Sequence, residues 1–419
     1  MSFDPLGISR RSFLQSSAIA AGTAALSARS YAQVAGANNR LRMAFIGCGT
    51  IGKEHMDGLL KIRDEENLDI VAICDVYRKR AEEFAAQAGG SVKITQRYED
   101  VLAMQDVDYV LIATPEHSHA YLTLAALDAG KHVYVEKPVT HTIPEAVAVL
   151  AKTQQTGLKV QVGVQGMADD SYSSAYEAIR AGKLGKIVQA QIDYVRNYQE
   201  RGPWRRETVP AGRPDDLDWE TWVTPATARP FDAHRYLEWR CYSEYSGGIA
   251  TDLFIHRLTR LIKACGLQYP SRVCGMGGIY TWDDGRDLPD SMEMLAEYPA
   301  IDGITNGMTV HVLGTMANDD ENPHCIRGTD ATLTFTSGGW EIKADDKKGA
   351  IIATHKKTGG EDVKPHHRNH HDAIRNNAPL NCPVELGLYG LAAVRMANLS
   401  LKDRKMYGWD AQRQDAVAL

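Results

Sequence analysis

The sequence lacks a basic stripe, a low-complexity tract and an internal repeat. Its 419 residues carry a formal net charge of −6, with lysines and arginines interspersed among acids, which argues against a nucleic-acid partner. The apolar fraction of 44% and the charged fraction of 24% exclude the disordered and fibrous classes, and the length is sufficient for two domains. Beyond residue 32, no stretch is long and uncharged enough to cross a bilayer.

Cysteine is also scarce, and its spacing follows no recognisable pattern. The seven cysteines occur without a C-x-x-C pair. Four of them could pair in an oxidising compartment, although their spacing assigns no connectivity. These four are Cys265, Cys274, Cys325 and Cys382.

A glycine-rich turn follows the apolar run at residues 42–46, which predicts a strand. The turn has the G-x-G-x-x-G spacing and consists of Gly47, Cys48, Gly49, Thr50, Ile51 and Gly52. The first glycine permits a tight turn, the second lets the backbone approach a pyrophosphate, and the third lets the next helix pack against the strand. The N–H groups at the start of that helix would then face the anion. We therefore expect a dinucleotide-binding site and chemistry by hydride transfer.

Asp75 follows the second apolar run, residues 70–74, at the position expected for the ribose acceptor. Its carboxylate would accept hydrogen bonds from the adenosine 2′- and 3′-hydroxyls and would repel a 2′-phosphate, so it favours NAD over NADP. Arg78, Lys79 and Arg80 come directly afterwards. These three residues either neutralise a phosphate or form a solvated helix start.

The extreme N-terminus resembles an export signal. Residues 9–15 form a twin-arginine pattern around Arg10 and Arg11, and an alanine-rich run follows at residues 18–28. Small residues then occupy the two positions that a signal peptidase reads, so we predict a twin-arginine signal peptide over residues 1–32, with cleavage after Ala32. We expect the twin-arginine export machinery as a partner and a periplasmic or otherwise exported location.

Export has a consequence for the cofactor. The twin-arginine route is associated with proteins that fold, and often load a cofactor, before they cross the membrane. Because no nicotinamide pool exists outside the cytoplasm, an exported dehydrogenase must keep its dinucleotide and regenerate it in place. We therefore expect tightly bound NAD and a reaction cycle that is redox-neutral over two half-steps.

Two patterns of secondary structure divide the remaining chain. Between residues 40 and 160, apolar strands alternate with helices, which predicts a Rossmann doubly wound parallel sheet. The expected strands are 70–74, 109–113, 132–135 and 160–165, and the expected helices are 81–88, 120–129 and 144–156. From residue 161 to 419, long strands with few intervening helices predict an α+β domain with a large open, mostly antiparallel sheet for substrate binding and oligomerisation. These strands are expected at 187–198, 272–280, 291–298, 307–314 and 331–336. The irregular stretch 202–230 predicts a loop over the site or an oligomer contact.

Several motifs together resemble one known family. They are the glycine turn, the run 113–119 (Ala-Thr-Pro-Glu-His-Ser-His), the run 129–138 that ends in Glu-Lys-Pro, and Gly247-Gly248 followed by residues 252–256 (Asp-Leu-Phe-Ile-His). The chain is thereby similar to the glucose-fructose oxidoreductase, inositol dehydrogenase and rhizopine catabolism (Gfo/Idh/MocA) family over nearly all of its mature length. The resemblance implies a Rossmann domain, a C-terminal open sheet whose exposed face mediates a homodimer or homotetramer, and a sugar or cyclitol substrate.

The residue types at these positions suit oxidation of an alcohol. Lys137 ends a strand at the ligand edge of the sheet, where its ammonium can hydrogen-bond the reacting hydroxyl and stabilise alkoxide character. Asp252 and His256 are four residues apart, so on a helix both would meet the same substrate. We predict His256 to be the general base, with a pKa near the working pH, and Asp252 to orient the substrate or raise the basicity of the imidazole.

Other residues complete the predicted site. The expected cofactor-binding residues are Gly47, Gly49, Thr50, Ile51, Gly52, Asp75, Thr114, Pro115, His117, His119, Glu136, Lys137 and Gln165. Of these, His117 and His119 either line the cofactor or cap the next helix. Candidate sugar-binding residues are Arg196, Tyr198, Trp204, Trp239 and Arg240, each of which could equally serve packing. The histidine-rich run 366–372 indicates the start of an amphipathic helix, and we assign no metal to it.

The predicted function is that of an exported NAD-dependent oxidoreductase acting on a secondary alcohol or ketone of a carbohydrate. One alternative is a glycosidase that oxidises a ring hydroxyl, eliminates the aglycone and returns the hydride; the branch of the family known for that reaction departs from the Glu-Lys-Pro pattern kept here. The other alternative is a sugar-binding protein without turnover, which has no need of a proton acceptor such as His256.

Overall fold

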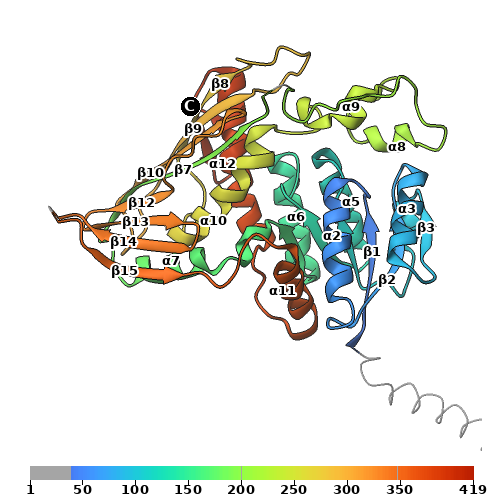
Figure 1. The fold of residues 1–419 in the computed structure, drawn as a ribbon, viewed down its shortest axis with the longest axis horizontal. Coiled ribbons are helices and arrows are strands. Elements are labelled where there is room, and N and C mark those ends of the chain that lie inside the picture. Colours follow the sequence, from blue (N-terminus) through green and yellow to red (C-terminus); the bar gives the residue numbers. More distant parts are fainter. Residues whose placement is uncertain (1–38, 200, 347) are drawn as a thin grey trace, which may run out of the picture.

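The computed structural model describes residues 39–199, 201–346 and 348–419. The signal peptide expected over residues 1–32 lies outside the described residues. Within them the chain forms a six-stranded sheet and an eleven-stranded sheet, which lie on opposite sides of the molecule (Figure 1). Both parts of the predicted fold class are confirmed.

The first sheet is entirely parallel, with strand order β3-β2-β1-β4-β5-β6. Its strands are β1 (Leu41–Ile46), β2 (Leu68–Cys74), β3 (Lys93–Thr95), β4 (Tyr109–Ile112), β5 (His132–Glu136) and β6 (Val160–Gly163). The helices between them are α2 (Thr50–Ile62), α3 (Arg78–Ala88), α4 (Tyr98–Leu102), α5 (His119–Asp128) and α6 (Ile143–Thr156). The strand order reverses between β1 and β4, which creates the crevice where such sheets bind ligands.

The second sheet is antiparallel except for the pair β7 and β10 among its described strands. Its strands are β7 (Ile187–Asn197), β8 (Arg272–Gly278), β9 (Ser291–Tyr298), β10 (Met308–Thr315), β11 (Ala317–Asn318), β12 (Cys325–Gly328), β13 (Ala331–Thr336), β14 (Gly339–Ala344), β15 (Ile351–Lys356), β16 (Tyr407–Asp410) and β17 (Asp415–Ala418). The five strands predicted from sequence are all present, and β11, β12 and β14 to β17 were not predicted.

Helices cover one face of the second sheet. They are α7 (Asp170–Arg180), α10 (Ile255–Cys265) and α12 (Val384–Asp403). Strand β9 shows the resulting alternation, since Met292 and Met294 are buried whereas Glu293 and Leu295 are exposed. The opposite face carries exposed apolar side chains, including Leu295 and Met276, and is uncovered within the described chain.

A segment of the second half of the chain reaches over the first sheet. Residues 202–245, which we call the arm, contain α8 (Trp219–Val223) and α9 (Ala233–Leu237), and Figure 1 shows both helices beyond the main body of the second sheet, near α3 and α5. Backbone contacts fasten the arm to the first sheet, because the N–H of Asp218 donates to the carbonyl of Val76 over 2.9 Å. The arm has an aromatic core of its own, made by Trp219, Trp222, Tyr236, Tyr242 and Tyr245.

Another segment returns to the first sheet near the C-terminus. Helix α11 (Val363–Asn376) packs against α2 and contains the histidine-rich run, so the predicted helix at this position is confirmed. Four of its histidines are fully buried: His366, His367, His370 and His371.

Two further expectations concern membrane crossing and thiol pairing. Among the described residues, no helix is both long enough and apolar enough to span a bilayer. All seven cysteines fall within the described chain and all are free thiols, so the structure forms none of the disulfides that Cys265, Cys274, Cys325 and Cys382 could have made.

Candidate active site

A cavity of about 1170 Å³ lies between the glycine turn and the second sheet. Eleven of the thirteen expected cofactor residues line it, and the exceptions are Gly52 and His117. All five candidate sugar-binding residues also line it. The structure therefore brings the predicted nucleotide and sugar residues to one continuous cavity.

The glycine turn fits a dinucleotide. Gly47 has φ +99°, and a Cβ there would lie 2.7 Å from the carbonyl carbon of Ala113. A Cβ on Gly52 would lie 2.7 Å from the carbonyl oxygen of Gly47, which explains why Gly52 serves helix packing and does not face the cavity. Apart from the two chain neighbours of Gly49, no described residue has an atom within 4 Å of a Cβ added there, so the start of α2 is open where a pyrophosphate would sit.

Asp75 marks the adenosine end of the cavity. Its carboxylate accepts the N–H of Cys48 over 2.6 Å and the N–H of Tyr77 over 2.8 Å. Burial raises the pKa of Asp75, and the charge of Arg80 opposes that rise. Of the three basic residues that follow, Arg78 pairs with Glu82 on the surface, whereas Arg80 lines the cavity.

Lys137 and Asp252 form an ion pair across the cavity, which links the end of β5 to the segment before α10. Lys137 follows β5, and its Nζ donates to Asp252 Oδ1 over 2.7 Å and to the Asp252 carbonyl over 2.8 Å. Arg240 Nε donates to the same carboxylate oxygen over 2.9 Å. Although burial alone would raise it, Arg240 and Lys137 hold the pKa of Asp252 well below its usual range. Asp252 is therefore an anion that fixes two cations beside the nucleotide.

His256 lines the same cavity and is only half-buried. Burial and the charge of Lys137 lower the pKa of His256 well below its ordinary value, against a smaller opposing effect of Asp252. The expectation of a pKa near the working pH is thus wrong, and the imidazole is neutral at neutral pH. The Asp252 carboxylate is bonded to Lys137 and Arg240, and no hydrogen bond joins it to His256 in the described chain.

The segment that carries these residues is held by a buried carboxylate from the first sheet. Asp252 lies in a π-helical turn, Ala250–Phe254, which precedes α10 and departs from the α-helix expected there. Glu116 accepts hydrogen bonds from Ser246 Oγ over 2.7 Å, Gly247 N–H over 3.0 Å and Thr251 Oγ1 over 2.9 Å. Glu116 therefore anchors the start of the π-helical turn to the nucleotide domain.

Removing this carboxylate should weaken the protein without emptying the nucleotide site. In Glu116→Ala the hydroxyls of Ser246 and Thr251 lose their buried acceptor, at a cost of about 1–3 kcal/mol for each donor left without a partner, whereas Gly247 N–H keeps Thr251 Oγ1 as an acceptor at 2.9 Å. We expect a lower free energy of unfolding and a lower kcat, measured by chemical denaturation and turnover, with the NAD content per chain unchanged. Glu116→Gln retains one acceptor oxygen and should lose less; equal stability of wild type and Glu116→Ala would contradict this role.

The two histidines after Thr114 both bond to backbone carbonyls. His117 is buried away from the cavity, where its Nε2 donates to the carbonyl of Trp222 over 2.9 Å, so the prediction that it lines the cofactor is wrong. Its ring packs against Trp222 and Tyr245, which ties the arm to the first sheet. His119 touches the cavity, but its two nitrogens lie 2.7 and 2.8 Å from the carbonyls of Pro138 and Thr114. Neither side chain caps a helix.

Glu136 and Gln165 are hydrogen-bonded to each other next to Lys137. Glu136 Oε1 accepts from Gln165 Nε2 over 2.7 Å and lies 2.8 Å from His55 Nε2, while its other oxygen accepts the N–H of Lys137 over 3.2 Å. This carboxylate therefore holds the backbone of Lys137. His55 continues the contact, since its Nδ1 lies 2.9 Å from His367 Nε2 in α11.

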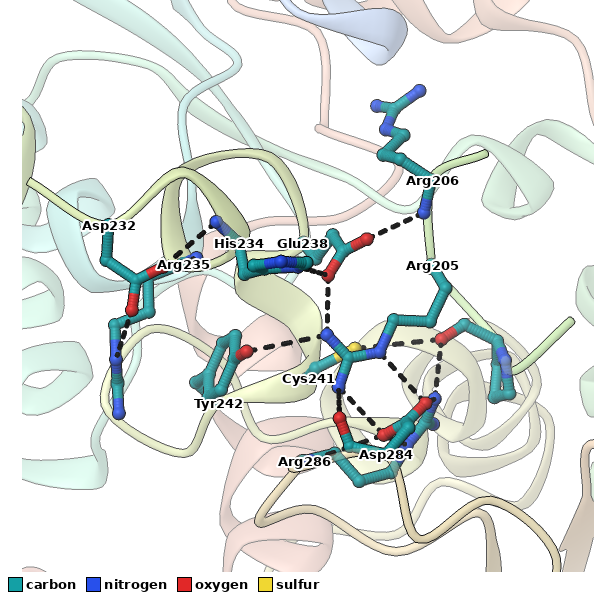
Figure 2. A network of polar contacts seen from close by, with 11 residues as sticks. Arg205, Arg206, Asp232, His234, Arg235, Glu238, Cys241, Tyr242, Asp284 and Arg286 are labelled. Atoms are coloured by element: carbon teal, nitrogen blue, oxygen red, sulfur yellow. Dashed lines mark hydrogen bonds and ion pairs between the residues drawn. The ribbon is translucent and has the colours of Figure 1, made fainter. Parts of the chain in front are cut away.

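A polar network fixes the outer wall of the cavity. Figure 2 shows Arg205 between Glu238 and Asp284, with Nη1 2.5 Å from Glu238 Oε2 and Nη2 2.7 Å from Asp284 Oδ1. Glu238 also accepts the backbone N–H of Arg206 over 2.7 Å. The network fastens the start of the arm to the segment that carries Trp239 and Arg240.

Sequence reasoning assigned no role to Glu116, Tyr194 or Arg206. Glu116 stood inside the quoted motif, but only the fold reveals that its partners are residues 246–251. Tyr194 and Arg206 line the cavity from a strand and from the arm, and no local pattern distinguishes them from ordinary strand and loop residues.

The parallel sheet with its glycine turn is typical of a dinucleotide-binding fold, and one cavity beside it brings together Lys137, Asp252 and His256. Comparison with family models agrees: residues 41–164 match the model of an oxidoreductase family with an NAD-binding Rossmann fold, and residues 173–264 match that of the family's C-terminal alpha/beta domain. The chain belongs to this Gfo/Idh/MocA oxidoreductase family.

Individual relatives agree in sequence over part of the chain. It is 35% identical over 179 residues to 4-carboxy-2-hydroxymuconate-6-semialdehyde dehydrogenase of a Sphingobium species, which covers 43% of this chain and 55% of the relative. It is 32% identical over 150 residues to scyllo-inositol 2-dehydrogenase (NAD(+)) of Bacillus subtilis, covering 36% and 43%. The chain thus spans about half the length of the curated relatives it matches.

Solved structures share the fold. An oxidoreductase domain protein from Kribbella flavida superposes with a TM-score of 0.68 at 19% identity, over 88% of this chain and 98% of that one. The WlbA dehydrogenase from Bordetella pertussis, in complex with NADH and UDP-GlcNAcA, gives 0.65 at 18% identity, over 88% and 99%. At such identities the likeness establishes the fold alone.

Proposed function

We propose that this protein is an exported oxidoreductase that transfers a hydride between tightly bound NAD and a secondary alcohol or ketone of a sugar or cyclitol. One observation carries the proposal: Lys137 Nζ lies 2.7 Å from Asp252 Oδ1 in the cavity that also contains His256 and the glycine turn. Relatives named inositol 2-dehydrogenase support the substrate class, among them that of Rhodococcus erythropolis, 35% identical over 150 residues, which are 36% of this chain and 42% of that relative.

The residues divide the chemistry between them. NAD bound in the cradle supplies the hydride acceptor. Lys137, held by Asp252, donates a hydrogen bond to the reacting oxygen and stabilises its developing negative charge. His256 is neutral and accepts the hydroxyl proton. Arg240 and Asp252 keep the lysine ammonium in place.

The preference for NAD and its retention are supported by the adenosine end of the cavity. The Asp75 carboxylate would meet the ribose hydroxyls and repel a 2′-phosphate. The arm lies over this end, where Trp222 and Tyr236 line the cavity. Retention suits the export proposed from the twin-arginine pattern, because the cofactor would cross the membrane inside the folded protein. We also propose a homodimer or homotetramer through the uncovered face of the second sheet.

Cofactor retention can be measured directly. Protein purified from the exported fraction and dialysed should release NAD in near-stoichiometric amounts on acid treatment. The Trp222→Ala variant removes a large side chain from the arm and should lose most of its NAD on dialysis. The control is Phe335→Ala, which changes a residue of β13 outside the cavity lining and should retain its NAD. A dialysed wild-type protein without NAD would contradict the retention proposal.

A substrate panel tests the reaction and separates the alternatives. The purified protein is incubated with sugars, cyclitols and aryl glycosides while cofactor absorbance and aglycone release are followed. Reduction of bound NAD without release supports the oxidoreductase. Release without net reduction would instead identify the redox-assisted glycosidase, and neither signal would identify a sugar-binding protein.

A further inference from the structure

One cation in the sugar-binding part of the cavity has no acidic partner. Arg196, near the end of β7, donates from Nη2 to the hydroxyl of Tyr194 over 3.0 Å and from Nη1 to the hydroxyl of Tyr198 over 3.3 Å. No carboxylate pairs with it in the described part of the chain. By contrast, Arg205 and Arg240 on the same cavity each have carboxylate partners. The Arg196 guanidinium is therefore a positive charge that the described protein leaves uncompensated.

This cation lies one side chain away from the proposed base. The guanidinium carbon of Arg196 is 5.2 Å from the ring centroid of Tyr194, and that ring is 6.4 Å from the imidazole of His256. The position of Tyr194 is fixed further by Arg257, whose guanidinium carbon lies 4.7 Å from the same ring and which is paired with Asp193. Arg196 and His256 thus lie on either side of Tyr194, and a sugar with its reacting hydroxyl at His256 could reach Arg196.

Trp204 and Arg206 add an aromatic ring and a further cation to the cavity lining, and no carboxylate pairs with Arg206 among the described residues. Trp204 has φ +64°, a conformation that costs a bulky residue about 1–3 kcal/mol and persists only where its surroundings hold it. The neighbouring Arg205 supplies that restraint through Glu238 and Asp284. Arg206 follows, and Figure 2 shows its guanidinium pointing away from the network, with no dashed contact. Trp204 and Arg206 both line the cavity.

The charge and shape of this region match a sugar that carries an acid. Tyrosine and tryptophan rings offer apolar surface together with a polar edge, which suits the mixed faces of a pyranose. A guanidinium binds a carboxylate with two parallel hydrogen bonds and is matched to its single charge. We propose that the substrate is a sugar acid, such as a uronate, and that Arg196 binds its carboxylate. This inference rests on the proposed oxidoreductase function and narrows its substrate class.

The test compares matched acidic and neutral sugars on the NAD-containing protein. D-glucuronate and D-galacturonate are set against D-glucose, D-galactose and D-glucose 6-phosphate, with binding followed by quenching of tryptophan fluorescence and turnover by reduction of bound NAD. We expect the uronates to bind roughly 10-fold or more tightly than their neutral counterparts, as a charge-assisted hydrogen-bonded pair would give.

Variants assign the effect to one residue. Arg196→Gln should weaken uronate binding by roughly 10- to 100-fold and weaken the binding of neutral sugars by a much smaller factor. Arg196→Lys keeps the charge but not the paired donors, so its affinity for uronates should fall between those of the wild type and Arg196→Gln. The control is Arg413→Gln, which changes an exposed arginine in the turn between β16 and β17. Retained NAD absorbance verifies that each variant is folded.

The outcomes separate this inference from the proposed function. Reduction of NAD by neutral sugars with no preference for uronates would overturn the inference and leave the oxidoreductase intact. A preference for glucose 6-phosphate, or a preference for uronates that Arg196→Gln does not change, would also overturn it. Failure of every sugar and cyclitol to reduce NAD would contradict the proposed function itself, and with it the inference.

Discussion

His256→Ala should lower kcat for the best panel sugar by roughly 10²- to 10⁴-fold, the usual contribution of a positioned general base. Burial and the charge of Lys137 lower the pKa of His256, so the imidazole is unprotonated at neutral pH and has a nitrogen free for the hydroxyl proton; the weaker basicity places the effect toward the lower end of that range. Its side chain makes no hydrogen bond within the described chain, and its removal should therefore leave the fold and the NAD content unchanged. Turnover and acid-released NAD are measured on the same preparation.

Two comparisons distinguish a base from a structural residue. Added imidazole should restore part of the activity of His256→Ala, because a small base can enter the space left by the side chain. His311→Ala, on the uncovered face of the second sheet, should have wild-type kcat. A His256→Ala variant that retains near-normal turnover would remove His256 from the mechanism, whatever the outcome with imidazole.

The second large effect is a loss of stability in mild acid. Burial lowers the pKa of His117 and of His366 from 6.5 to about 4, and it lowers the pKa of His367 and His370 well below their ordinary values. The unfolded chain binds protons at these histidines below pH ~6.5, whereas the folded protein does not. Stability is therefore full above pH ~6.5 and falls as the pH decreases toward 4.

The magnitude is large relative to the stability of a protein. One pKa unit corresponds to about 1.4 kcal/mol, so His117 and His366 should together remove about 6 kcal/mol by pH ~4, against a typical total of 5–15 kcal/mol. Glu116 and Asp252 have lowered pKa values and add to the loss only at more acidic pH, as they themselves take up protons. Between pH 6.5 and 5 the histidines dominate the slope.

Urea unfolding at a series of pH values measures this slope. His366→Gln retains a donor for the carbonyl of Val162, which His366 Nε2 contacts over 2.9 Å, and should reduce the slope by up to about 1.4 kcal/mol per pH unit. A free energy of unfolding that stays constant from pH 7 to pH 5 would show that these histidines do not remain neutral in the folded state.

The sequence predicted the nucleotide domain closely because its signals are local. The apolar runs predicted β1, β2, β4, β5 and β6, since these strands are largely buried on both faces, and the glycine turn predicted the start of α2. Strand β3 was missed because Lys93–Thr95 has only three residues and no periodicity to detect.

The sequence identified residues of the site but not the hydrogen bonds and ion pairs between them. Lys137, Asp252 and His256 do meet in one cavity, yet the ion pair of Asp252 with Lys137 and the anchoring by Glu116 join residues that are 115 and 130 positions apart in the sequence. His117 was misplaced because its partner, the carbonyl of Trp222, lies 105 residues away on the arm. Partners of this kind become visible only after the chain has folded.

Because of helix α11, the nucleotide domain cannot be exchanged as one continuous stretch of sequence. This helix comes late in the chain but lies on α2, and it places His367 against His55 behind the carboxylate that holds Lys137. A recombinant exchange at residue 160 would therefore give the recipient a nucleotide domain stripped of its native covering helix. A functional exchange of the nucleotide domain would therefore have to include the arm and α11, the two later segments that contact it.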